Sequence, residues 1–115
     1  MKVFSSAPDG NEAADLAPAR YFNLAIKQIL EIEEWMRTAK QAAQPLLVHI
    51  DAFVYFSKKY PDMAKRRIRK IDIDQVKTTF DDWYERCSSK IPAEFRDGIR
   101  ENADELFSEL QNIAN

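Results

Sequence analysis

Hydrophobic side chains recur at steps of three and four residues over three long stretches of the chain. The first stripe follows Pro18 and consists of Phe22, Ala25, Ile29, Ile32, Met36, Ala39 and Ala43. The second consists of Ile73, Val76, Phe80, Trp83 and Cys87, and the third of Phe95, Ile99, Ala103, Leu106, Leu110 and Ile113. Because this spacing places side chains on one face of an α-helix, each stretch is predicted to be an amphipathic helix.

The ends of these helices are marked by polar residues and prolines. Pro18 suits the first turn of the first helix, which is predicted to run for about 24 residues, or about 36 Å. Asp72 is predicted to cap the second stripe, with Gln75 in the reciprocal position of a capping box. Pro45 and Pro92 mark breaks in the helical pattern.

Residues 46–56, LLVHIDAFVYF, fit two structures. His49 and Asp51 alternate with apolar neighbours, as in a strand, yet Leu47, Ile50 and Val54 have helical spacing. A single strand would have no partner in this chain, which favours a helix. Because this helix would be apolar nearly all round, we expect it to be the most buried one.

These elements predict an all-α protein. Helices joined by short connections hide their apolar faces by packing together, so we expect a compact bundle of four main antiparallel helices. Residues 1–16 lack periodicity and are predicted to be a flexible tail, leaving residues 17–115 as a single helical domain. Residues 61–71 would form a basic connector or a short helix between the second and third main helices.

Charge is distributed unevenly along the chain, although the net charge is only −2. The run KKYPDMAKRRIRK, residues 58–70, holds seven of the 17 basic side chains, and residues 58–71 together carry +6. Residues 72–115 carry five basic and eleven acidic side chains, a charge of −6. Such polarity orients and speeds the encounter with a charged partner.

Residues that support catalysis are scarce. His49 is the only histidine and Cys87, the only cysteine, lies on an apolar stripe. One His and one Cys do not build an ordinary zinc site, and the isolated Gly10 and Gly98 form no phosphate-binding loop. The acids Glu31, Glu33 and Glu34 point in different directions around a helix and are predicted to be solvated. We therefore expect a protein that is not an enzyme and needs no metal or cofactor.

The chain also lacks membrane and secretion signals. No apolar stretch of the required length follows Lys2, and the longest apolar run is too short to span a bilayer. A single cysteine forms no internal disulfide, which favours a reducing compartment. A cytoplasmic protein that does not act at membranes is therefore predicted.

The leading functional hypothesis is a small helical protein-binding module, of the adaptor, chaperone, inhibitor or regulator type, that acts by occupying a partner's surface. The predicted contacts are Trp35, Arg66, Arg67 and Arg69, because Trp and Arg dominate interface energetics. A partner that is acidic at the contact fits these arginines, and self-association through the long first helix is a further possibility.

The basic run leaves two alternatives to a protein dock. It could be a solvated connector paired with the protein's own acids, or a nucleic-acid contact. In the nucleic-acid hypothesis Lys58, Lys59, Lys65 and Lys70 join the arginines in contacting phosphates. The acidic segment that follows would repel the same phosphates, so nucleic acid is the less favoured partner.

Overall fold

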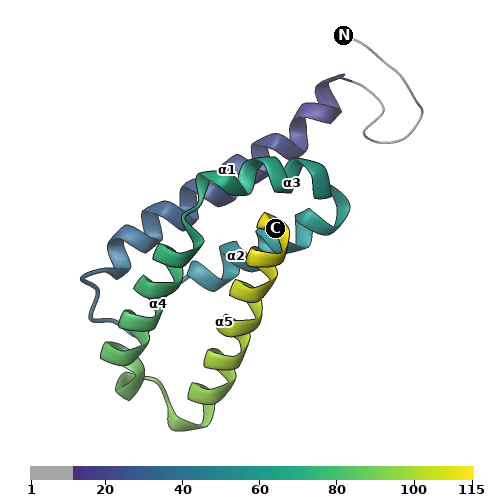
Figure 1. The fold of residues 1–115 in the computed structure, drawn as a ribbon. Coiled ribbons are helices and arrows are strands. Elements are labelled where there is room, and N and C mark those ends of the chain that lie inside the picture. Colours follow the sequence, from purple (N-terminus) through teal and green to yellow (C-terminus); the bar gives the residue numbers. More distant parts are fainter. Residues whose placement is uncertain (1–11) are drawn as a thin grey trace.

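The structure is a computed structural model that describes residues 12–115, and this part of the chain contains helices and no strands (Figure 1). The elements are α1 (Glu12–Met36), α2 (Leu46–Lys59), α3 (Pro61–Arg67), the 3₁₀ helix η1 (Ile68–Lys70), α4 (Ile73–Cys87), the 3₁₀ helix η2 (Ser88–Lys90) and α5 (Ala93–Ala114). The all-α prediction is confirmed. Residues 46–56 are helical, and residues 61–70 form a short helix and a 3₁₀ turn.

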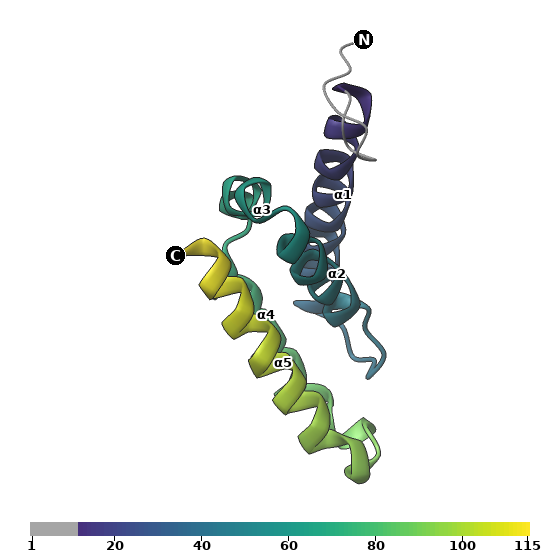
Figure 2. The ribbon, with the colours of Figure 1, turned by 90° about the vertical axis from the view of Figure 1, so that its right-hand side faces the viewer.

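The helices form two hairpins joined by α3. In Figure 1, α1 and α2 run antiparallel, α4 and α5 form a second antiparallel pair, and α3 lies beside α1. Figure 2 shows the α4–α5 pair inclined to the α1–α2 pair. The predicted bundle of four antiparallel helices is not confirmed in this detail. None of the described helices is long and apolar enough to cross a bilayer.

The core extends along the contact between the two hairpins and beneath α3. Its largest fully buried side chains include Trp83, Phe22, Phe53, Phe80 and Phe107. The rings of Phe22 and Phe53 join α1 to α2 at 5.1 Å between centroids, and those of Phe80 and Phe107 join α4 to α5 at 5.8 Å. Each pair contains a residue from a predicted stripe, so the periodicity identified these helix faces correctly.

Helix α1 lies earlier in the chain than its stripe predicts. It begins at Glu12 and passes through Pro18, so residues 12–16 of the expected tail are helical, while residues 1–11 lie outside the described part. It ends at Met36 instead of near Ala43. The cause is a set of donors on α4. Arg86 donates to the carbonyls of Met36 (2.7 Å) and Ala39 (3.1 Å), and Trp83 donates to that of Gln41 (2.9 Å). A longer helix would have bonded the carbonyls of Met36 and Ala39 internally, whereas the Gln41 carbonyl would have faced Pro45, which has no N–H to donate.

Glu33 is the most unexpected residue of α1, because it is buried and not solvated as predicted (3% exposed). Arg37 binds both of its carboxylate oxygens, at 3.0 and 2.9 Å. Two residues of α4, Thr79 and Gln75, donate further hydrogen bonds at 2.7 and 3.4 Å. Burial alone would raise the pKa of Glu33, but these hydrogen bonds and the charge of Arg37 leave it below its usual value. Glu33 thus fixes α1 against α4.

The cap of α4 was predicted correctly in its first half. The Asp72 side chain accepts a hydrogen bond from the backbone N–H of Gln75 at 3.1 Å. Instead of completing a capping box, the Gln75 side chain reaches Glu33.

Candidate protein-binding surfaces

The outward face of α2 carries large apolar side chains that nothing in the described chain covers. Val48 is 67% exposed and Tyr55 is 73% exposed, although Ile50, Phe53 and Val54 of the same helix are buried. The prediction that α2 would be the most buried helix is therefore wrong. The helix packs through one side only, because α1, α3 and α5 all contact it from the core side and no element lies over its outer face.

A pocket of about 360 Å³ lies between α1 and α2, next to this face. It is lined by Tyr21, Leu24, Ala25, Gln28, His49, Ala52 and Phe56. Tyr21 stacks on Phe56 at 5.4 Å between ring centroids, and both Tyr21 and Leu24 are more than half exposed. The apolar surface of α2 therefore continues onto α1. We call Tyr21, Leu24, Val48 and Tyr55 the apolar face.

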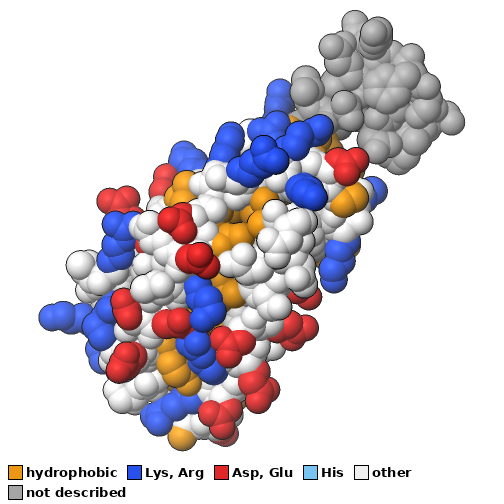
Figure 3. All heavy atoms as spheres, viewed as in Figure 1, with side chains coloured by type: hydrophobic (Ala, Val, Ile, Leu, Met, Phe, Trp, Pro, Cys, Tyr) orange, Lys and Arg blue, Asp and Glu red, His pale blue; other side chains and the backbone are white. Residues whose placement is uncertain are grey.

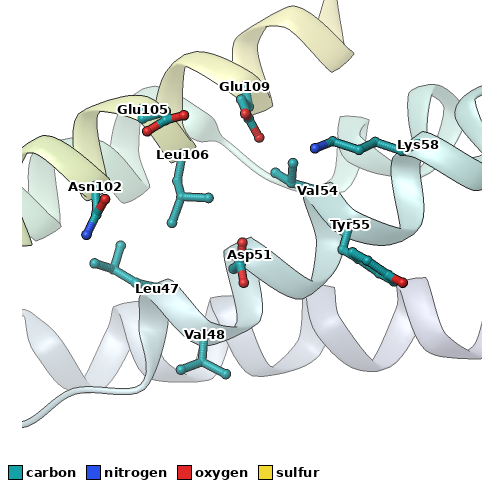
Figure 4. Close-up of a pocket in the computed structure, with 10 residues that line it drawn as sticks. All are labelled: Leu47, Val48, Asp51, Val54, Tyr55, Lys58, Asn102, Glu105, Leu106 and Glu109. Carbon is teal, nitrogen blue, oxygen red and sulfur yellow. The ribbon is translucent and has the colours of Figure 1, made fainter.

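A second pocket, of about 530 Å³, lies between α2 and α5 (Figure 4). In Figure 4, Leu106 points from α5 toward Leu47 of α2, and Asp51 lies on α2 between Leu47 and Val54. Glu105 and Glu109 line its α5 side, and Lys58 extends into one end. Val48 and Tyr55 of the apolar face also line this pocket, which combines apolar walls with a mainly acidic rim.

The seven basic residues of the 58–70 run surround α3 and η1, and we call them the basic ridge. Figure 3 shows basic side chains gathered along the edge formed by α3, with acidic side chains spread over α4 and α5. No ion pair joins the ridge to a residue of the described chain. Arg67 donates a 2.9 Å hydrogen bond to Asn23 of α1, whereas Arg66 and Arg69 are exposed. Among the residues that the structure describes, the ridge thus forms no ion pair with an acidic side chain.

The predicted partner contacts, Trp35 and the three arginines, lie on different parts of the surface. Arg67 reaches α1 at Asn23, twelve positions before Trp35, and residues so spaced are about 120° apart around a helix. Trp35 is 43% exposed and lies on the same side of α1 as Tyr21 and Leu24. The predicted contacts therefore divide between two surfaces. Trp35 lies on the side of α1 that belongs to the apolar face, and the arginines belong to the basic ridge. The α2 residues of the apolar face were not identified from periodicity alone.

The two reactive side chains lie in different environments. Cys87 is buried and its thiol faces the carbonyl of Ala39 at 3.7 Å, while His49 is half-buried in the α1–α2 pocket. Within residues 12–115, no group of His, Cys, Asp or Glu side chains is arranged to hold a metal ion.

Comparisons with protein-family models, with curated proteins and with solved structures find no significant match to this chain.

Proposed function

We propose that this protein is a small, non-catalytic helical module that binds another protein by occupying part of its surface. One observation carries the proposal: Val48 and Tyr55 are exposed on the outer face of α2, with Asp51 between them, and Tyr21 and Leu24 extend the apolar surface onto α1. Contiguous exposed apolar side chains mark interaction sites, and tyrosine is among the residues that contribute most at interfaces. In this proposal the protein acts by presenting a surface complementary to its partner and catalyses no reaction.

The basic ridge adds a second element to this proposal. Arg66 and Arg69 project from α3 and η1 into solvent, where they can orient an approaching protein whose surface is acidic where it meets the ridge. Arg67 is held by Asn23 and contributes its charge from a fixed position. Self-association is an extension of the same idea, because Tyr21, Leu24 and Trp35 lie along one side of α1. The free thiol of Cys87 suits a reducing, cytoplasmic setting for this module.

Affinity capture from the source cell, with chemical crosslinking, tests the proposal. The full chain is expected to recover the same protein repeatedly, with crosslinks near the apolar face or the basic ridge. The molar mass in solution is measured in parallel by light scattering. The proposal would be contradicted if repeated capture recovered no protein and light scattering showed that the protein is a monomer in solution.

Nucleic-acid binding through the basic ridge is the second candidate. It is favoured by the absence of ion pairs between the ridge and the described acids, and by its position along one edge of the molecule (Figure 3). Lys58, Lys59, Lys65 and Lys70 would contact phosphates together with the arginines, so affinity would fall steeply with salt.

A gel-shift titration decides between the two candidates. The double variant Arg66→Glu, Arg69→Glu removes two exposed cations and spares Arg67, which hydrogen-bonds α1. The matched control is Lys27→Glu, Lys40→Glu, which makes the same change of charge at exposed positions outside the ridge. A salt-sensitive shift lost only in the ridge variant would establish nucleic-acid binding. No shift at up to about 100 µM protein, the expected result, would remove this candidate, since dissociation constants for non-specific binding are about 1–100 µM at physiological salt.

A further inference from the structure

The apolar stripe of α5 is only partly covered by the rest of the protein. Ala103, Phe107 and Leu110 are buried, but Ile99 is half-buried and Phe95 is 56% exposed. The sequence predicts all of this stripe as core. The uncovered members belong to the side of α5 that faces α2 and the loop after α1.

This side of α5 borders a continuous groove. The α2–α5 pocket meets another pocket, of about 540 Å³, at Asn102, which lines both. The second pocket is lined by Ala42, Ala43, Lys90, Ile91, Pro92, Glu94, Phe95, Gly98, Ile99 and Asn102. Apart from the adjacent residues and backbone of α5 itself, no described atom lies within 4 Å of the place where a Cβ on Gly98 would stand, so the groove is open there. From Phe95 to Glu109 it follows α5 for about 21 Å, the length of about four helical turns.

Acidic side chains predominate along the groove. They are Asp51, Glu94, Glu105 and Glu109. The basic side chains are Lys58 at one end and Lys90 at the other, and Lys90 is already bonded to the carbonyl of Lys40. None of the four carboxylates forms an ion pair with a residue of the described chain. Glu105 and Glu109 are one turn apart on α5, so they present two negative charges along one wall.

We propose that this groove binds a basic amphipathic α-helix of the partner protein. The inference rests on the proposed function and specifies its partner. One long wall of the groove is α5, and the other is α2 followed by the loop that contains Ala42 and Ala43. Neither described wall is a strand, so an extended peptide has no strand edge to join, whereas a helix can lay apolar residues into the groove. Its apolar residues at steps of three and four contact Phe95, Ile99 and Leu106. Its lysines or arginines on one flank face Glu105 and Glu109, and on the other Asp51.

Two synthetic peptides test the chemistry of the groove. Each is about 18 residues long, or five turns, with leucine at steps of three and four. One carries lysine at the remaining positions and its twin carries glutamate. Binding to the full-length protein is measured by fluorescence anisotropy at low and physiological salt. The lysine peptide is expected to bind, more weakly as salt is added, and the glutamate peptide is expected to bind at least about tenfold less tightly.

Charge-reversed variants locate the binding site. The double variant Glu105→Lys, Glu109→Lys is expected to bind the lysine peptide at least about tenfold less tightly than the wild type does. The control Glu85→Lys, Asp97→Lys makes the same change of charge at exposed positions that do not line the groove, and it is expected to have little effect. Circular dichroism confirms that each variant is folded.

Three results would overturn the inference: equal binding of the two peptides, no binding of the lysine peptide, or equal weakening by the two double variants. A dimer that Phe95→Glu dissociates would also overturn it, because the groove would then bind a second copy. The groove shares Val48 and Tyr55 with the apolar face, so the variants that locate the peptide change only Glu105 and Glu109 on α5. Peptide binding tests the chemistry of the groove and affinity capture tests the proposed function, so the two can fail independently.

Discussion

The hydroxyl of Thr79 on α4 donates a 2.7 Å hydrogen bond to the carboxylate of Glu33 on α1. Both residues are buried, and together they fix the position of the second hairpin against the first. A buried carboxylate is stable only when its oxygens are satisfied, and here Arg37 and Gln75 supply the remaining donors. This polar contact within an apolar interface leads to the first two predictions.

Thr79→Val keeps the shape of the side chain and removes the donor. The free energy of unfolding is expected to fall by about 1.5–3 kcal/mol, because hydrogen bonds to charged groups contribute that much. Chemical denaturation at neutral pH measures it. The neighbouring Thr78→Val is the control, since Thr78 is exposed on the same helix and its loss is expected to stay within about 0.5 kcal/mol. Equal effects of the two substitutions would mean that the Glu33 contact adds no stability.

Lowering the pH is expected to reduce the free energy of unfolding through protonation of Glu33. The pKa of Glu33 in the folded state lies below the ordinary 4.5, because the hydrogen bonds from Arg37, Thr79 and Gln75 outweigh the opposing effect of burial. A lowered carboxylate pKa contributes stability above the unfolded-state pKa, and this contribution is lost as the pH falls through the folded-state value. The difference in unfolding free energy between the wild type and Glu33→Gln is therefore expected to be constant near neutrality and to shrink below about pH 4.5. A difference that does not change down to strongly acidic pH would contradict this assignment.

Arg86→Ala is expected to loosen the end of α1. The substitution removes the hydrogen bonds to the carbonyls of Met36 and Ala39, at a cost of about 1 kcal/mol. The amide protons of Arg37 and Thr38, which bond to the last turn of α1, are expected to exchange about fivefold faster with solvent. Glu85→Ala, one position earlier and exposed, is the control. Unchanged exchange at these two amides would show that Arg86 does not determine where the helix ends.

Substitutions on α2 separate binding from folding. Val48→Asp and Tyr55→Ala are expected to change the free energy of unfolding by less than about 0.5 kcal/mol, because both side chains are mostly exposed. Both are expected to reduce recovery of the partner in affinity capture, as measured by quantitative mass spectrometry. Trp35→Ala tests how far the contact extends along α1. Full recovery with both α2 variants would exclude the apolar face from the interface.

Periodicity predicted the helices well because it reports local amphipathicity. The stripe from Ile73 to Cys87 coincides with α4, and Asp72 caps it as expected. The features that were missed depend on residues distant in the chain. The end of α1 is determined by Arg86 and the burial of Glu33 by Thr79, and neither contact leaves a signal in the sequence around α1.

Periodicity likewise does not distinguish an apolar residue that packs inside the protein from one that packs against a partner. For this reason the exposure of Val48, Tyr55 and Phe95 was not predicted, although the basic run that forms the ridge was.

The contacts that end α1 also affect the order of events during synthesis. Arg86 follows Met36 by 50 residues, so the ribosome must add these residues before the last carbonyls of α1 meet their donor. At about 5–20 residues per second, this interval lasts about 3 to 10 s. During this time the nascent chain holds α1, α2 and then α3, with the α1 face for α4 uncovered. The first hairpin is therefore the part of the nascent protein that a chaperone at the exit tunnel would encounter with its apolar side exposed.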